Sequence, residues 1–113
     1  MLLSGVTITF IKQFALGIWL TFPMLLSIAV TILVLGQIAG KIEHWPNYES
    51  FYWSFITATT VGYGDIRPTH KSSRFFAIVI ALMGLTMTGI FIAVAVHAAT
   101  LALTAHDAAM NVK

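Results

Sequence analysis

Cysteine is absent from the 113 residues, and charged residues are few. The lack of cysteine excludes disulfides, thiolate catalysis and cysteine-bound metals. Charged residues make up 9% of the chain, against about 25% in a typical globular domain, and no basic run suggests nucleic-acid binding. Hydrophobic residues make up 58%, more than a soluble domain of this size can bury. The composition therefore favours one small domain whose solvent is lipid.

The groups that could support catalysis are sparse and scattered. The acids are Glu43, Glu49, Asp65 and Asp107, and there are four histidines. Their spacing matches neither a metal-ligand set nor a nucleophile–base pair. We therefore expect no enzyme activity and no organic cofactor.

The first long apolar run lies between Lys12 and Lys41, which enclose no charged residue. A membrane-spanning helix needs roughly 20 apolar residues, so we expect one over about 23–40. Pro23 either begins this helix or kinks a longer one, because proline is tolerated in a first turn and disrupts an interior. If it begins the helix, residues 1–22 form a separate segment that can lie as a helix on the membrane surface.

The second long apolar run begins after Arg74, and residues 75–105 contain no Asp, Glu, Lys or Arg. A helix over about 74–105 exceeds the hydrocarbon thickness of about 30 Å, so it must tilt or emerge from the membrane. Small residues, which let membrane helices approach closely, recur in this run: Ala77, Ala81, Gly84, Gly89, Ala93, Ala95, Ala98 and Ala99. A short polar tail over 106–113 follows.

The segment between the two runs, residues 41–74, carries most of the charges, two of the three Trp and all three Tyr. Asn47 is a suitable cap for a helix from Tyr48 to about Thr59, too short to span a bilayer. A short helix and a glycine-containing strand between two spanning helices indicate a re-entrant loop. Such a loop is tolerated at membrane depth only when it is buried in protein or lines a wet cavity.

Residues 57–65 read Thr-Ala-Thr-Thr-Val-Gly-Tyr-Gly-Asp. This run resembles the signature of potassium channels, in which Thr-Val-Gly-Tyr-Gly is the selectivity filter. The resemblance covers about 23–105 and is strongest to the two-helix prokaryotic channels of the KcsA type. It implies an all-α membrane protein with an outer helix, a re-entrant pore helix over about 48–59, an extended filter over 60–64 and an inner helix.

The same resemblance implies a four-fold symmetric homotetramer in the cell membrane that conducts K⁺ passively. Backbone carbonyls of Thr60, Val61, Gly62 and Tyr63 would replace the hydration shell of the permeant K⁺. Such a backbone alternates in conformation, and glycine takes positive φ without a Cβ penalty, which suits Gly62 and Gly64.

Residues around the filter are expected to support it. We expect Val61 and Tyr63 to be held by packing and Tyr52 and Trp53 to supply that support. Asp65 would accept a hydrogen bond from the indole of Trp53.

Two positions depart from the KcsA type. Ile56 stands where that type has a glutamate paired with the aspartate after the filter, so carboxylate-driven filter inactivation is expected to be weak. Arg67 stands where many relatives carry an aromatic residue that binds external tetraethylammonium through a cation–π contact. Four arginines would repel that cation.

The inner helix offers gating candidates. Gly84 aligns with the hinge glycine of the family, Gly89 is a second candidate, and Thr88 is expected to line the cavity. Helical spacing places Ile92 and Val96 on the same face as Thr88, and residues 92–100 are the candidate hydrophobic constriction. The alternative for both glycines is that they merely allow close packing.

Other gating devices have weaker support. No helix carries the regular Arg or Lys of a voltage sensor. A regulatory domain would have to lie outside this chain, which is either a natural minimal channel or the pore of a longer one. His97 and His106 suggest a proton sensor, but a hydrogen-bonded His97 at a helix contact is the better reading.

The family orientation places both termini in the cytoplasm and the filter outside. It conflicts with the positive-inside rule, since Lys12 and Lys113 would be inside and Lys41, Arg67, Lys71 and Arg74 outside. We give precedence to the resemblance.

Two alternatives remain. One is a non-selective Na⁺/K⁺ channel of the same architecture, although such relatives often replace the residue at Tyr63 with Asp. The other is a non-conducting membrane subunit that assembles with channel partners.

Overall fold

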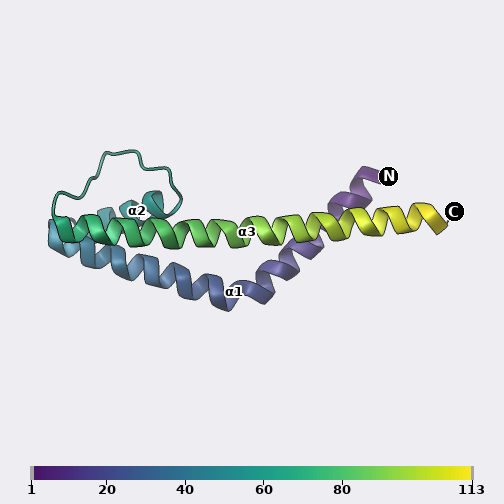
Figure 1. Cartoon of the computed structure of the whole chain (residues 1–113), viewed down its shortest axis with the longest axis horizontal. Helices are drawn as coiled ribbons and strands as arrows, with labels where there is room; N and C mark the ends of the chain where they lie inside the picture. The colour runs from purple at the N-terminus through teal and green to yellow at the C-terminus, as the bar shows by residue number, and fades with distance from the viewer. Residues whose placement is uncertain (1, 113) are drawn as a thin grey trace. The chain divides into compact units, whose positions relative to one another are not determined.

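The computed structural model describes the backbone of residues 2–112 and the side chains of residues 5–110. It contains three α-helices, α1 (Leu2–Glu43), α2 (Asn47–Ala58) and α3 (Lys71–Val112), and residues 2–112 contain no strand (Figure 1). The terminal residues of the predicted segments 1–22 and 106–113, Met1 and Lys113, lie outside this description. The expected all-α fold is confirmed.

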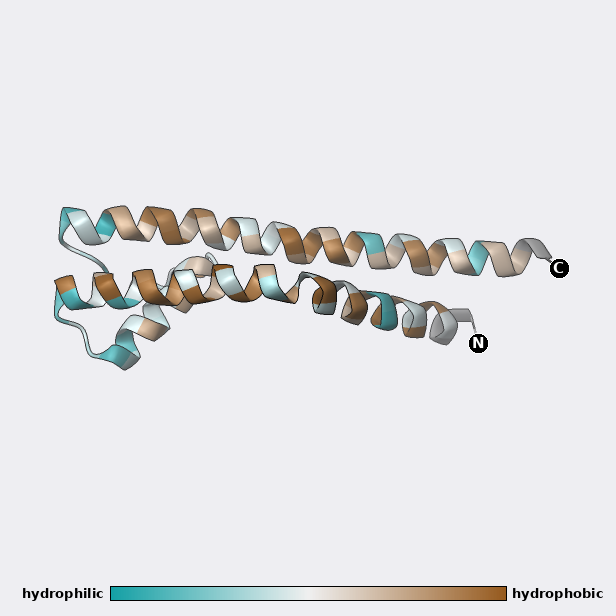
Figure 2. Cartoon of the chain, turned by 90° about the horizontal axis from the view of Figure 1, so that it is seen from below, coloured by the Kyte–Doolittle hydropathy of each residue, from teal (hydrophilic) through white to brown (hydrophobic). Residues whose placement is uncertain are grey.

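Two of the helices have the length and composition of membrane spans. Gly5–Glu43 and Lys71–Met110 are both strongly apolar, and only 11% of the most apolar stretch of each is buried within the chain. Figure 2 shows hydrophobic residues along most of both helices. Because so much apolar surface is left uncovered, lipid or other chains must cover it.

The helix α1 continues through Pro23, so the proline lies inside a longer helix, the second of the two alternatives. Both sides of the proline are apolar, and in lipid a helix is the form that satisfies the backbone. The helix ends where His44 adopts a φ of 63°. There the N–H groups of His44 and Trp45 donate to the carbonyls of Lys41 (3.4 Å) and Gly40 (2.8 Å), the pairing of a Schellman cap.

The helix α3 is longer at both ends than the predicted range of 74–105. At its C-terminal end it takes in most of the predicted tail. This segment contains Ala108, Ala109 and Met110, which are strong helix formers.

The short helix α2 begins at Asn47, one residue earlier than predicted. Asn47 is not its cap: that position is Pro46, which makes no side-chain capping bond. The fixed φ of proline, here −61° with ψ at 155°, gives the chain an extended entry into the helix. The Pro46 carbonyl then accepts the first helical bond, from Ser50 N–H at 3.0 Å.

The chain divides into two compact units, and each is described by itself. Unit 1 comprises residues up to Pro23 and from Gly89 onward, and unit 2 comprises Met24–Thr88. In unit 1 the helices approach through small residues: Ala98 and Ala102 are each 1% exposed. A Cβ on Gly17 would lie 2.6 Å from Val94 Cγ1. The predicted role of small residues in close packing is confirmed here.

Unit 2 contains α2 and a small hydrophobic core. The buried members of this core are Ile32, Ala39, Trp53 and Ile80, one or two from each helix. On the α1 side, Gly36 and Gly40 face Ser54 and Ser50. A Cβ on either glycine would lie 2.8 or 2.7 Å from the Cβ of its serine. The Ser50 hydroxyl donates to the carbonyl of the N-cap residue Pro46, and the Ser54 hydroxyl donates to the Ser50 carbonyl. The helix α2 therefore packs tightly on α1 without unpaired polar groups at these two serines.

Candidate functional site

The segment after α2 alternates in backbone conformation. Thr60, Gly62 and Gly64 have positive φ values of 65°, 53° and 82°, whereas Val61 and Tyr63 do not. The positive φ expected at the two glycines is confirmed, and Thr60 extends the alternation by one residue. Successive carbonyls of such a backbone can point to the same side, as a run of carbonyl ligands requires.

Thr60 is the strained member of this segment. A β-branched residue with positive φ is an outlier, and the left-handed conformation costs roughly 1–2 kcal/mol. Two hydrogen bonds tie the strained turn to α2: Thr60 N–H donates to Thr57 O at 3.2 Å, and Gly62 N–H to Ile56 O at 3.0 Å. The end of α2 therefore dictates where residues 60–64 begin.

The side chains of this segment are not packed within one chain. Val61 is 50% and Tyr63 72% exposed, and a Cβ on Gly62 would meet nothing within 4 Å. The expected packing around Val61 and Tyr63 is therefore not supplied by the chain itself.

The carboxylate of Asp65 is held by Tyr52. The Tyr52 hydroxyl donates to Asp65 Oδ2 at 3.0 Å. The partner of Asp65 is therefore Tyr52 and not the expected Trp53, its neighbour in the sequence. Partial burial first, and then the hydrogen bond and charge of Asp65, raise the pKa of Tyr52 above its usual 10. The phenol therefore remains the donor at physiological pH.

Trp53 lies on another face of α2, in the core of unit 2. It is 3% exposed, and its ring centroid lies 5.2 Å from that of Trp45. Neighbouring residues on a helix point about 100° apart, so Tyr52 and Trp53 cannot both face Asp65. Ile56 is also buried, at 5%, and its side chain offers Asp65 no acidic partner.

A cluster that sequence reasoning missed joins the end of α1 to the start of α3. The Glu43 carboxylate accepts hydrogen bonds from Thr69 N–H (3.0 Å), Thr69 Oγ1 (2.9 Å) and His70 N–H (2.8 Å). It also lies 2.8 Å from His70 Nδ1. The Glu43 side chain is only 4% exposed, and it sits at the N-terminal end of α3, which favours an anion.

The gating candidates on α3 differ in their surroundings. Gly84 is buried, against the backbone of Ala58 at the end of α2. Gly89 is exposed, and a Cβ added to it would meet no other atom within 4 Å. Thr88 is exposed, as are Ile92 (58%) and Val96 (59%), so these side chains are left uncovered in one chain.

Two further candidates, His97 and Arg67, are exposed. His97 borders a hollow of about 320 Å³ within unit 1 that Gly17 also lines. Arg67 lies beside Gly64. Among the described residues, no group of three His, Asp or Glu could hold a metal ion through side chains.

Comparison with known proteins identifies the family. A sequence profile of the family described as "Ion channel" matches residues 18–100. The chain belongs to the ion channel family. It is therefore a membrane transport protein and not an enzyme, and the matched range includes most of α1 and all of α2 with the alternating segment.

Two relatives of this ion channel are animal proteins. It is 38% identical over 69 residues to the "TWiK family of potassium channels protein 7" of Caenorhabditis elegans, covering 58% of this chain and 12% of that protein. It is 33% identical over 67 residues to the "Potassium channel subfamily K member 2" of Homo sapiens, covering 59% and 16%. The chain thus spans under a fifth of the length of these two relatives. No solved structure matches it.

Proposed function

We propose that this ion channel conducts K⁺ selectively and passively, through carbonyls of Thr60, Val61, Gly62 and Tyr63. The observation that carries the proposal is the positive φ at Thr60, Gly62 and Gly64, alternating with Val61 and Tyr63. Stacked rings of carbonyls can replace the hydration shell of K⁺. The similarity to proteins named as potassium channels supports the same ion.

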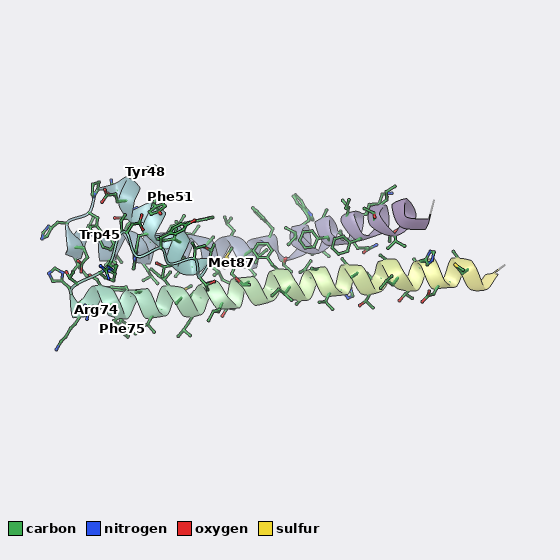
Figure 3. All side chains as sticks on the ribbon, turned by 90° about the horizontal axis from the view of Figure 1, so that it is seen from above. Trp45, Tyr48, Phe51, Arg74, Phe75 and Met87 are labelled. Carbon is green, nitrogen blue, oxygen red and sulfur yellow. The ribbon has the colours of Figure 1, made fainter. Side chains whose placement is uncertain are left out.

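The channel is a homotetramer in this proposal, because one chain cannot surround an ion with carbonyls. The exposure of Val61 and Tyr63 supports it. So do the aromatic residues Tyr48 (80%) and Phe51 (50%), which project from α2 in Figure 3. Three further copies around a four-fold axis would cover these side chains and close the ring.

The helices take the following roles in the proposed pore domain, residues 23–105. The part of α1 after Pro23 is the outer helix, α2 is the re-entrant pore helix, and α3 is the inner helix. The negative end of the α2 dipole then stabilises a cation in the cavity. Tyr52 and Asp65 brace the filter, and Thr88, Ile92 and Val96 line the inner pathway. The filter faces the outside of the cell membrane, and both termini are cytoplasmic.

The proposal is tested by the reversal potential of purified protein in a planar bilayer, with K⁺ on one side and Na⁺ on the other. A reversal near the K⁺ equilibrium potential is expected. A clear current that reverses near zero would instead favour the alternative, a non-selective Na⁺/K⁺ channel of the same architecture. Tyr63→Asp is the matched control and is expected to move the reversal toward zero. A protein that assembles in lipid but carries no current would favour a non-conducting subunit.

A further inference from the structure

The two glycines of the inner helix, Gly84 and Gly89, lie in opposite environments. A Cβ on Gly84 would collide with the carbonyl oxygen of Ala58 and would lie 2.6 Å from that residue's carbonyl carbon and its Cα. A Cβ on Gly89 would meet nothing within 4 Å. Within one chain, an added methyl group would therefore collide with backbone at Gly84 and would meet no other residue at Gly89.

The obstacle at Gly84 is backbone, so no side-chain rotation can relieve it. Ala58 is the last residue of α2, two residues before Thr60. A methyl group on Gly84 would therefore move either α3 or the end of α2.

A second close contact, with α1, restricts how α2 can move. Ser50 and Ser54 of α2 are 1% and 0% exposed, and they pack against Gly40 and Gly36 of α1 at similarly close range. The position of α2 is therefore set by three glycines, Gly36 and Gly40 of α1 and Gly84 of α3. A displacement at Ala58 would instead pass to Thr60 and Gly62, whose N–H groups are bonded to Thr57 and Ile56 in the last turn of α2.

We propose that Gly84 is a positioning residue for the ion-selective segment: its missing Cβ fixes the end of α2 and so the conformation of residues 60–64. This inference rests on the proposed function, since it assigns the selectivity of that segment to a contact on α3. It differs from a hinge role, in which Gly84 would change how often the pore opens and not which ion passes.

The test compares Gly84→Ala with Gly89→Ala, which adds the same methyl group to the same helix. Both are reconstituted alongside the unmodified protein, and the K⁺/Na⁺ permeability ratio and open probability are measured in the same bilayers. Gly84→Ala is expected to lower the permeability ratio at least tenfold, and Gly89→Ala to leave it unchanged. A changed open probability with an unchanged permeability ratio in Gly84→Ala would overturn the inference and support the hinge.

If Gly84→Ala fails to assemble, a second protein still tests the inference. Four subunits linked in tandem, with Gly84→Ala in one of them, reduce the disturbance to one methyl group per pore. A lowered permeability ratio supports the inference, and a ratio equal to that of the unmodified tandem protein refutes it. If the unmodified protein is itself non-selective, the proposed function fails, which is a separate result from equality of the variants.

Discussion

At the scale of single residues, the hydrogen bond between Tyr52 and Asp65 tests how the filter is braced. Tyr52→Phe removes the donor and keeps the ring. An exposed hydrogen bond of this kind stabilises less than a buried one, because water competes for both partners. We expect the ratio of conducting to non-conducting channels to fall roughly twofold to tenfold. This ratio is measured from the steady-state current as a fraction of the peak current. Tyr48→Phe is the control, because it removes a hydroxyl from the same helix and leaves the bond between Tyr52 and Asp65 in place, and equal behaviour of the two variants would count against the brace.

Arg67 is the second residue whose chemistry predicts a measurable property. Four exposed guanidinium groups near the outer mouth would repel external tetraethylammonium, so weak block of the unmodified channel is expected. Arg67→Tyr should strengthen the block about tenfold or more, because each ring offers a cation–π contact worth about 0.5–1 kcal/mol at an exposed site. Arg67→Gln removes the positive charge without adding an aromatic ring, so it shows how much of the stronger block comes from lost repulsion alone. High-affinity block of the unmodified channel would contradict the prediction.

At the scale of elements, the packing of α2 on α1 depends on two glycines four residues apart. Gly36→Ala would place a Cβ 2.8 Å from Ser54 Cβ, and overpacking of this kind costs typically about 1–3 kcal/mol. We expect a lower melting temperature of the purified protein and recovery in the double variant Gly36→Ala, Ser54→Gly. Gly5→Ala is the control, because its Cβ meets nothing within 4 Å. A melting temperature for Gly36→Ala equal to that of the control would refute the contact.

The Glu43 cluster connects two elements that are far apart in the sequence. Glu43→Gln keeps the shape but replaces a charged acceptor of several hydrogen bonds with an amide, one of whose ends can only donate. Each donor left unpaired costs about 1–3 kcal/mol of stability, so we expect a clear fall in melting temperature. Glu49→Gln serves as the comparison, since Glu49 is exposed. A smaller effect at Glu43 than at Glu49 would show that the cluster contributes little.

At the scale of the whole molecule, the sequence predicted what depends on local composition. Long apolar runs indicated two spanning helices, and the Gly62 and Gly64 positions indicated positive φ. Contacts between distant residues were not predictable: Glu43 and His70 are separated by 27 positions, and nothing local marks Gly36 as a partner of Ser54. The choice of Tyr52 over Trp53 depends on the rotation of α2, which a motif does not fix. Pro23 left two alternatives open because its effect depends on what surrounds the helix.

The tetramer itself can be tested through its ion. If K⁺ binds only to the assembled filter, mass action stabilises the tetramer, by about 2.7 kcal/mol for one site at a concentration 100 times the Kd. We expect the purified protein to run as a tetramer in detergent and to melt at a higher temperature in K⁺ than in Na⁺ of equal ionic strength, with a difference that grows with K⁺ concentration. Tyr63→Asp should remain assembled and lose most of the difference. Equal melting temperatures of the unmodified protein in the two salts would mean that no K⁺-selective site forms on assembly, even if the four chains associate.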